Sequence, residues 1–399
     1  MRKKVIVDAK GEPFLLKGQM WLYSNNAVVN EDIEDGSFVD VVNEAGSFIG
    51  AGSYSSCSHI TVRLFTHDET VEFDESYFEK KIRSAYSFRK TIMPDSLDSC
   101  RIIFAEADGI PGWIVDRYND VLVSEMTTAA LEQRKDMLFE ILLKVMEEDG
   151  QTIRDMYERN DIAPRSKEGL ELYKGFYKEA HGPAETVMNE NGLLIGVDFE
   201  NGQKTGYFLD QKSNRVLVRN MSRGKKVLDC FTHTGGFALN AAYGGASHVT
   251  AVDVSALALE KAEENAKRNH INERMTFTKA DVFEYLDSVK PGDFDTIVLD
   301  PPAFTKSRRT VDHAYNGYKT INKKAMDVLK ETEGYLVTCS CSRYMETELF
   351  EKMLKEAAQE CKAVLKQISV TQQNGDHPIL WNMAETSYLK FYIFQIQKA

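Results

Sequence analysis

The stretch "VLDCFTHTGGFALNAA", residues 227–242, joins an apolar run to a helix-forming run through two adjacent glycines. A turn at Gly235 and Gly236 lets a ligand approach the backbone closely, and the first amides of the following helix are free to bind it. The succession of strand, glycine turn and helix indicates one unit of a doubly wound α/β sheet. The dinucleotide fingerprint GxGxxG is absent from the stretch, which argues against an NAD site.

Further apolar runs follow the glycine turn and alternate with helical segments. The runs are "HVTAVDVS", "MTFTKADV", "FDTIVLD" and "GYLVTCSCS", and the intervening helices are represented by "ALALEKAEENAKRNH" and "YKTINKKAMDVLKETE". Alternation of strand and helix predicts parallel βαβ units. Residues 191–399 are therefore expected to form one doubly wound α/β domain.

The first half of the chain has a different pattern. Residues 1–70 contain short alternating runs broken by glycine and asparagine, which predicts a small, strongly bent all-β domain. Residues 71–190 combine amphipathic stretches with strand-like runs that turn signals separate, which predicts a small α+β domain. The helices expected there span 76–91 and 131–148.

Composition restricts the class of protein. The net charge is −12, which argues against nonspecific coating of nucleic acid, because such binding rests on Lys and Arg neutralising phosphates. A local basic run, "KSRR" at 306–309, remains compatible with phosphate binding. Six cysteines without a CxxC pair argue for a reducing compartment and against structural zinc, and the histidines have no metal-binding spacing. No apolar run reaches the length of a membrane span, so we expect a cytoplasmic protein without metal or membrane contacts.

Acidic residues end several of the expected strands. Asp229, Asp253, Asp281 and Asp300 each follow an apolar run, and in open α/β sheets ligands bind outside the carboxyl ends of the strands. One such acid is often only a helix cap. A series of them behind one glycine turn argues instead for a shared role in binding a ligand. Asp253 stands 18 positions after Gly235, where a carboxylate can accept hydrogen bonds from ribose hydroxyls.

This order of glycines and acids resembles the class I S-adenosylmethionine-dependent methyltransferases. The resemblance implies S-adenosylmethionine as cofactor, with Gly235 at its methionine part, Asp253 at its ribose and Asp281 at its adenine. Other cofactor contacts that the resemblance implies are Gln211, Asp229, Phe231, Gly236 and Val282.

Longer motifs resemble the bacterial large-subunit rRNA cytosine-C5 methyltransferase family. They are "GSYSSCSHITVRLFT", "EADGIPGWIVDRYND", "KTGYFLDQKSNR", "LDCFTHTGGFAL", "DPPAFTKS", "SCS" and "DHPI...ETSYLK", and they cover nearly the whole chain in order. The family joins an N-terminal PUA domain, a small α+β domain and a C-terminal methyltransferase domain. Large-subunit rRNA is thus the implied partner. Gln19 and Met20 stand where the PUA segment is expected to have His-Pro, which leaves the RNA-binding share of that domain open.

The chemistry of cytosine methylation gives roles to three motifs. Cytosine C5 is a poor nucleophile until a thiolate adds to C6. The resemblance implies that Cys341 of "SCS" is this nucleophile and that Asp300 faces N3 and N4 of the ring, whereas Cys339 is expected in the core. Lys306, Arg308 and Arg309 are expected to bind RNA phosphates.

Two other functions stay open. Related rRNA guanine methyltransferases share the pattern "DPP.F" and need no cysteine, so methylation at guanine N7 or N2 is the nearest alternative. A catalytically inactive RNA-binding assembly factor could keep the same fold. The target nucleotide, the choice between free rRNA and a ribosomal particle, and the oligomeric state, including a homodimer, are not fixed by the sequence.

Overall fold

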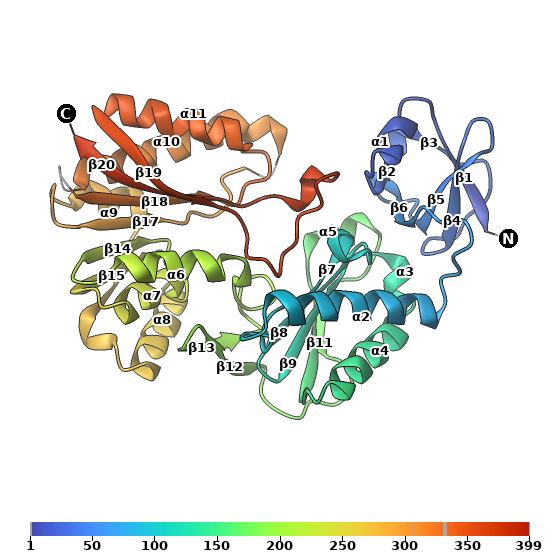
Figure 1. Ribbon diagram of the computed structural model, residues 1–399, viewed down its shortest axis with the longest axis horizontal. Helices are drawn as coiled ribbons and strands as arrows, with labels where there is room; N and C mark the ends of the chain where they lie inside the picture. Colours follow the sequence, from blue (N-terminus) through green and yellow to red (C-terminus); the bar gives the residue numbers. More distant parts are fainter. Residues whose placement is uncertain (1, 306, 330–332, 399) are drawn as a thin grey trace. The chain divides into compact units, whose positions relative to one another are not determined.

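The computed structural model describes residues 2–305, 307–329 and 333–398 (Figure 1). Chain contacts divide it into two compact units. Unit 1 comprises Met1–Asn189, Val197–Leu209 and Gly375–Thr386, and unit 2 comprises Glu190–Gly196, Asp210–Asn374 and Ser387–Ala399. The domain limits expected at residues 70 and 190 stay predictions.

The first sheet of unit 1 has six strands in the order β2-β6-β5-β4-β1-β3. Its strands are β1 (Lys3–Val7), β2 (Trp21–Tyr23), β3 (Ala27–Val28), β4 (Phe38–Asn43), β5 (Phe48–Tyr54) and β6 (Ile60–Thr66), and α1 spans Glu12–Leu16. A Cβ at Gly52 would lie 1.9 Å from the carbonyl oxygen of Arg63, so only glycine permits β5 and β6 to approach this closely. The β5–β6 register shifts beside Gly52, which supplies the expected bend.

The second sheet of unit 1 has five strands in the order β11-β10-β9-β8-β7. The strands are β7 (Ser99–Phe104), β8 (Trp113–Tyr118), β9 (Val121–Met126), β10 (Asp155–Asn160) and β11 (Tyr173–Phe176). The helices are α2 (Glu75–Ile92), α3 (Ala129–Glu132), α4 (Lys135–Glu148) and α5 (Ala163–Lys167). Phe78, Ile82, Trp113, Leu138 and Leu142 belong to one buried core under α2 and α4. This is the mixed α+β texture that the sequence predicts.

The single helix expected at 131–148 is wrong, because the structure has two helices there. Arg134 leaves the helical conformation, at φ −116° and ψ 11°, between α3 and α4. Its guanidinium donates to the carbonyl oxygen of Ala130 at 2.8 Å and lies over the Phe38 ring at 4.8 Å. These contacts use the carbonyl oxygen that a continuous helix would bind to a backbone amide, so the chain breaks at Arg134.

Unit 2 contains a seven-stranded sheet in the order β16-β15-β14-β17-β18-β20-β19. Its strands are β14 (Lys226–Cys230), β15 (His248–Asp253), β16 (Met275–Lys279), β17 (Thr296–Leu299), β18 (Gly334–Ser340), β19 (Ala363–Thr371) and β20 (Lys390–Lys398). The strands β14 to β18 pair in parallel, whereas β20 pairs antiparallel with both β18 and β19. The doubly wound α/β fold predicted for this region is confirmed. A separate two-stranded sheet, β12 (Glu185–Glu190) with β13 (Leu193–Asp198), lies where the chain crosses between the units.

Helices cover both faces of this sheet. Figure 1 shows α10 and α11 on one face and α6, α7 and α8 on the other. The helices are α6 (Lys212–Met221), α7 (Gly236–Tyr243), α8 (Ala256–Arg268), α9 (Val282–Ser288), α10 (Val311–Val328) and α11 (Thr347–Glu360). Since both faces are covered, β14 and β17 are buried and read as nearly continuous apolar runs.

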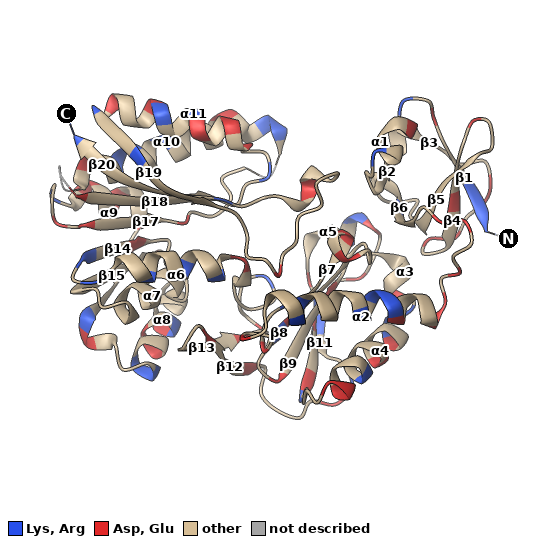
Figure 2. Ribbon diagram, viewed as in Figure 1, with Lys and Arg blue, Asp and Glu red and all other residues tan. Residues whose placement is uncertain are grey.

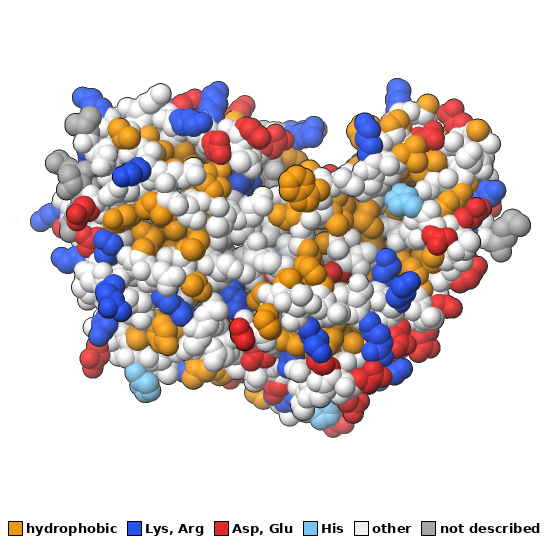
Figure 3. Space-filling view, viewed as in Figure 1, with side chains coloured by type: hydrophobic (Ala, Val, Ile, Leu, Met, Phe, Trp, Pro, Cys, Tyr) orange, Lys and Arg blue, Asp and Glu red, His pale blue; other side chains and the backbone are white. Residues whose placement is uncertain are grey.

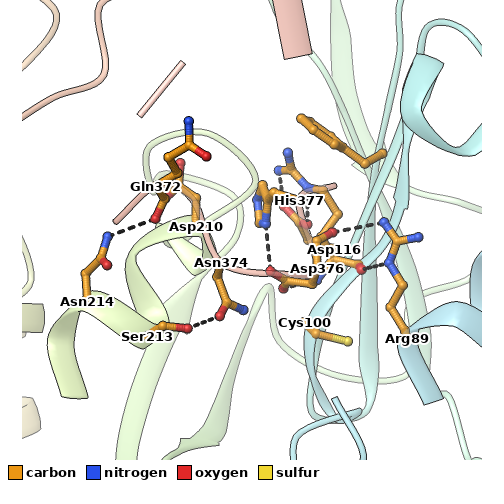
Figure 4. A network of polar contacts seen from close by, with 12 residues as sticks. Arg89, Cys100, Asp116, Asp210, Ser213, Asn214, Gln372, Asn374, Asp376 and His377 are labelled. Atoms are coloured by element: carbon orange, nitrogen blue, oxygen red, sulfur yellow. Dashed lines mark hydrogen bonds and ion pairs between the residues drawn. The ribbon is translucent and has the colours of Figure 1, made fainter. Parts of the chain in front are cut away.

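The chain leaves unit 2 after β19 and returns as β20. In between, Asp376 is held inside unit 1 (Figure 4). Its Oδ2 accepts from the Arg101 amide at 2.9 Å, its carbonyl oxygen accepts from Arg89 at 2.9 Å, and its Oδ1 lies 2.8 Å from Nδ1 of the buried His377. These buried hydrogen bonds hold the segment Gly375–Thr386, between β19 and β20, in unit 1.

The surface carries charges of both signs. Figure 2 shows Lys and Arg interspersed with Asp and Glu in both units, and Figure 3 shows them mixed on the face presented. A nucleic-acid contact therefore has to come from local groups rather than from a broad basic face. Among the described residues, no helix is long and apolar enough to cross a membrane.

Candidate active site

Four of the predicted site residues lie at one edge of the unit 2 sheet. Asp229 and Asp253 lie at the carboxyl ends of β14 and β15, Asp300 directly follows β17, and Cys341 directly follows β18. These strands are parallel, so their carboxyl ends meet at the same edge. The neighbouring strands β17 and β18 bring both residues to this edge, with Asp300 one residue beyond the Leu299–Thr338 pair and Cys341 three residues beyond it.

The glycine loop between β14 and α7 is strained. Phe231, His233 and Gly235 all have positive φ, at 61°, 52° and 88°. Such conformations cost free energy in residues other than glycine and gather at functional sites. Gly235 is followed at once by α7, and a Cβ on it would come within 3.1 Å of the Ala262 side chain. Glycine at this position therefore permits both the positive φ and the close packing of the loop against α8, and the loop leads directly into the first turn of α7, whose free amides can meet a ligand.

Asp229 is a buried carboxyl group with unused hydrogen-bonding capacity. Its Oδ2 accepts from Thr232 Oγ1 at 2.6 Å and from the Ala238 amide at 2.9 Å. Its Oδ1 is buried and has no hydrogen-bond partner among the described residues. The pKa of Asp229 is raised to about 7, mainly by burial and to a smaller extent by the charges of Asp300 and Asp253, while the two hydrogen bonds oppose the rise.

Asp253 anchors the glycine loop. Its Oδ2 accepts from the His233 amide at 2.9 Å, and its Oδ1 accepts from the Ser255 amide at 2.9 Å. An ionised carboxylate offers about four lone-pair sites, so acceptor capacity is left for a ligand. This acid therefore shapes the loop and is half-buried at the edge of the sheet.

The expectation that Asp281 ends a strand is wrong. The strand β16 ends at Lys279, and Asp281 is the N-cap of α9. Its Oδ1 accepts from the amides of Phe283 and Glu284 at 2.8 and 3.2 Å, which satisfies two free donors of the first helical turn. Val282 is then the first residue of the helix, and its side chain is buried.

Asp300 is held by groups that the sequence did not connect with it. Gln211 Nε2 donates to both carboxylate oxygens at 3.3 Å, and Asn214 donates to Gln211 Oε1 at 2.7 Å. Asn214 also binds the carbonyl oxygen of Gln372, at the end of β19 (Figure 4). Gln211 therefore orients Asp300 from the start of α6, with both ends of its amide engaged.

The two cysteines at the end of β18 differ in environment. Cys339 is fully buried, and its Sγ lies in donating distance of Asp300 Oδ1 at 3.0 Å and of the Leu299 carbonyl oxygen at 3.2 Å. Burial, followed by the charge of Asp300, raises the pKa of Cys339 well above its usual range. Cys341 is half-exposed at the strand end. Only Cys341 combines accessibility with this edge, whereas Cys339 is a protonated donor in the core.

Two polar groups that the sequence reasoning missed, Tyr318 and Lys390, bind the serines on either side of Cys341. Tyr318 of α10 has its hydroxyl 3.0 Å from both Ser340 Oγ and Ser342 Oγ, on either side of Cys341. Lys390 at the start of β20 donates from Nζ to the Ser342 carbonyl oxygen at 2.8 Å. The motif "SYLK" contains this lysine directly before an apolar run, and that placement is the signal that could have found it.

The expected RNA-binding residues lie just beyond the same edge. Arg308 and Arg309 belong to a short 3-10 helix, Arg308–Thr310, and both are exposed. Lys306 lies outside the described residues. The described part of the chain contains no group of acidic, histidine or cysteine side chains that could hold a metal ion.

The edge fits S-adenosylmethionine on its own chemistry. The cofactor carries an ammonium group, a sulfonium cation and ribose hydroxyls. Asp229 offers a buried oxygen without a partner, and Asp253 offers free acceptor sites beside it. Gly235, at the start of α7, lets the loop pack closely against Ala262 of α8. Cations and donors are the groups that these acceptors lack.

Comparisons with known proteins agree with the fold. A PUA-like domain model matches residues 5–67. The chain is 35% identical over 397 residues to "Ribosomal RNA large subunit methyltransferase I" of Escherichia coli O157:H7 and of Shigella boydii serotype 18, covering 98% of this chain and 99% of each relative. The solved structure of SMU.776 complexed with SAH superposes with a TM-score of 0.84 at 22% identity, covering 98% of this chain and 100% of that one, and so shares the fold. A family model described as S-adenosylmethionine-dependent methyltransferase matches residues 178–387, more than half of the chain, and the chain therefore belongs to the S-adenosylmethionine-dependent methyltransferase family.

Proposed function

We propose that this protein methylates C5 of a cytosine in large-subunit rRNA through a covalent adduct with Cys341. The names of the full-length relatives support large-subunit rRNA as the substrate. The motif "SCS" and the surroundings of Cys341 support cytosine C5 as the target atom. All six cysteines are free thiols, which supports a reducing compartment such as the cytoplasm.

One observation carries the choice of base. Cys341 follows β18 and Asp300 follows the adjacent parallel strand β17, so an accessible thiol and a carboxyl group share one edge of the sheet. A methyl transfer to guanine N7 or N2 has no use for a thiol. The covalent route to cytosine C5 needs a thiolate and an acid that faces the ring.

The residues of this edge then divide the work. The Cys341 thiolate forms a bond to C6, the electron pair of the C5–C6 double bond moves into the ring, and the Asp300 carboxyl group shares a proton with N3. S-adenosylmethionine supplies an electrophilic methyl group for C5. A base removes the C5 proton, the electron pair restores the double bond, and the Cys341 thiolate leaves.

The cofactor-binding roles follow the same edge. Asp253 binds the ribose hydroxyls, the loop at Gly235 meets the methionine part, and Asp281 with Val282 borders the adenine. Gly236, Phe231 and Asp229 complete the contact surface around the loop. Gln211 contributes through Asp300, because its amide already binds that carboxylate and Asn214.

An RNA with 5-fluorocytosine at the target position tests the adduct. Fluorine cannot leave C5 as a cation, so the bond between Cys341 and C6 should persist after methyl transfer. Wild-type protein with S-adenosylmethionine should give a covalent protein–RNA band on a denaturing gel. Cys341→Ala should give no band and should lose methylation of unmodified RNA.

Cys339→Ser is the matched control. A serine keeps a hydrogen-bond donor beside Asp300, so this variant should still form the band. If Cys341→Ala methylates RNA at a rate close to that of the wild type, the covalent mechanism is excluded and a guanine base becomes the better target. Absence of S-adenosylmethionine binding by the wild type would instead favour an inactive assembly factor.

A further inference from the structure

The antiparallel pairing of β18 and β20 brings a lysine to the candidate nucleophile. Lys390, the first residue of β20, pairs with Ser340, the last residue of β18. The next residue after Ser340 is Cys341, which directly follows the end of β18. The register therefore places the backbone of Lys390 beside that of Ser340, one residue before Cys341.

The lysine side chain turns toward the "SCS" segment. Its Nζ donates to the Ser342 carbonyl oxygen at 2.8 Å, so the ammonium group lies against the backbone on the far side of Cys341. Lys390 is 7% exposed, and it forms no ion pair with a carboxylate among the described residues. A buried cation without a carboxylate partner is expensive unless another negative group compensates it.

We next compare the titratable groups around Lys390 as candidates for the negative charge that offsets its ammonium group. The charge of Glu346, directly before α11, acts on Lys390. Tyr318 of α10 faces "SCS" as a protonated hydroxyl, because burial raises its pKa to about 12. Cys339 stays protonated in the core. Burial lowers the pKa of Lys390 to about 8, and Cys341 is the group that opposes this most. A Cys341 thiolate is therefore the anion best placed to offset the buried ammonium.

We propose that Lys390 is a positioning residue that holds Cys341 as a thiolate by placing its ammonium group beside the "SCS" segment. The role rests on the proposed function of Cys341 as the nucleophile. A neighbouring ammonium lowers the pKa of a thiol and so increases the fraction of thiolate near neutral pH. The proton of the thiol goes to water, and the ammonium stays protonated.

The rate at which Cys341 is alkylated measures its thiolate directly. The full chain would be treated with iodoacetamide from pH 5.5 to 9.5, and mass spectrometry of the peptides would follow Cys341 and, as internal reference, the exposed Cys57. Lys390→Gln keeps a hydrogen-bond donor for the Ser342 carbonyl oxygen but removes the charge. We expect the Cys341 inflection in this variant to shift upward by about one pH unit, a roughly tenfold slower alkylation at pH 7.

Two further variants separate charge from packing. Lys390→Arg should restore the wild-type profile, whereas Lys390→Met should behave as Lys390→Gln does. The difference between wild type and Lys390→Gln should shrink above about pH 8, where Lys390 itself loses its proton. Cys57 should give the same profile in all variants, and thermal unfolding should confirm that each variant is folded.

The outcome is independent of RNA and of the methyl donor. If Cys341 has the same profile in wild type and in folded Lys390→Gln, Lys390 has only a structural role and the inference is wrong. If the profile shifts but Cys341→Ala still methylates RNA, the effect of Lys390 on the Cys341 thiol is supported. The proposed function of Cys341 as the nucleophile is then wrong.

Discussion

Two sites, one in each unit, differ in how they hold buried charge. In the second sheet of unit 1, Arg101 binds both carboxylate oxygens of Asp116 at 2.7 and 2.8 Å, and Arg89 is buried against Asp108. At the carboxyl edge of unit 2, Asp229 keeps a buried oxygen without a partner among the described residues. Matched charges hold a fold, whereas a charge left over at a strand edge is capacity for a ligand.

Each unit also contains a case of the other kind. Arg215 and Glu190 of unit 2 form a buried pair with two contacts of 2.6 Å, away from the edge. Glu125 of unit 1 is buried, and its pKa is raised to about 7 by that burial, but Arg101 opposes the rise. The difference thus concerns the two sites, the Arg101–Asp116 pair and the edge at Asp229, more than the two units as wholes. The following experiments test it at each site.

The largest effect is expected in unit 1, where a matched pair would be split. Arg101→Met should lower the free energy of unfolding by about 3–5 kcal/mol, because Asp116 is left buried without its cation. The three tryptophans, Trp21, Trp113 and Trp381, all belong to unit 1, so their fluorescence in a urea titration reports this unit.

An exposed pair supplies the control for Arg101→Met. Arg83 contacts Glu79 and Glu148 on the surface, with 41% of its side chain exposed. Arg83→Met should change the free energy of unfolding by less than about 1 kcal/mol, since water screens such pairs. Equal effects of the two substitutions would contradict the role given to burial.

The next effect concerns the unmatched Asp229. Its pKa of about 7 lies above the ordinary 3.8, so the folded protein binds the proton more tightly than the unfolded chain does. The stabilisation is complete below about pH 4 and is lost as the pH rises through 7, by at most about 1.4 kcal/mol per pH unit. Asp229→Asn should remove this dependence and unfold at higher urea than the wild type at pH 8. Hydrogen exchange of the β14 peptide across a urea series measures it, and a pH dependence that persists in the variant would refute the assignment.

A smaller effect is expected for the cofactor. Asp253→Ala should weaken S-adenosylmethionine binding by about 1–3 kcal/mol, the scale of a hydrogen bond to a charged acceptor. Isothermal calorimetry would measure it. Asp281→Ser keeps a side-chain cap for α9 but removes the carboxylate, so a loss of affinity in that variant would be due to the adenine contact and not to an unfolded helix. Unchanged affinity in Asp253→Ala would make Asp253 an anchor of the loop only.

The smallest effect is expected for the exposed arginines beyond the edge. Replacing Arg308 and Arg309 with alanine should reduce the slope of log affinity against log salt by about 0.7–0.9 per lost phosphate contact. Filter binding of rRNA fragments at several salt concentrations would show it. Arg223 and Lys226 border the opposite ends of the strands, so their replacement should leave the slope unchanged. The idea fails if both pairs of substitutions have the same effect.

Local sequence patterns correctly predicted the strands and the glycine turn, because neighbouring residues determine these features. The apolar runs that stop at Asp253 and Asp300 are strands because both faces of the sheet are covered, and the glycine turn at Gly235 needs a positive φ. Asp281 was misplaced because an acid that caps a helix and an acid that ends a strand look alike when only Ala280 and the cap itself separate the two elements.

Contacts between distant segments could not be predicted. Gln211 reaches Asp300 across 89 positions of sequence, and Cys339 contacts the same carboxylate from the next strand. Lys390 meets "SCS" only because β20 pairs with β18, although β19 is the strand that precedes it along the chain. Such pairings depend on which surfaces the whole sheet buries, and no periodicity within a short window records that.

The order β18-β20-β19 also has a consequence during synthesis on the ribosome. The strand β19 leaves the exit tunnel before β20, yet β20 is its partner in the sheet and separates it from β18. The sheet of β1 to β6 can form as it emerges, whereas β19 keeps an unpaired edge until β20 inserts. The nascent chain therefore acquires its PUA-like sheet first and its complete candidate active-site edge last. A ribosome that stalls before β20 would present a folded PUA-like domain on a chain that cannot yet methylate.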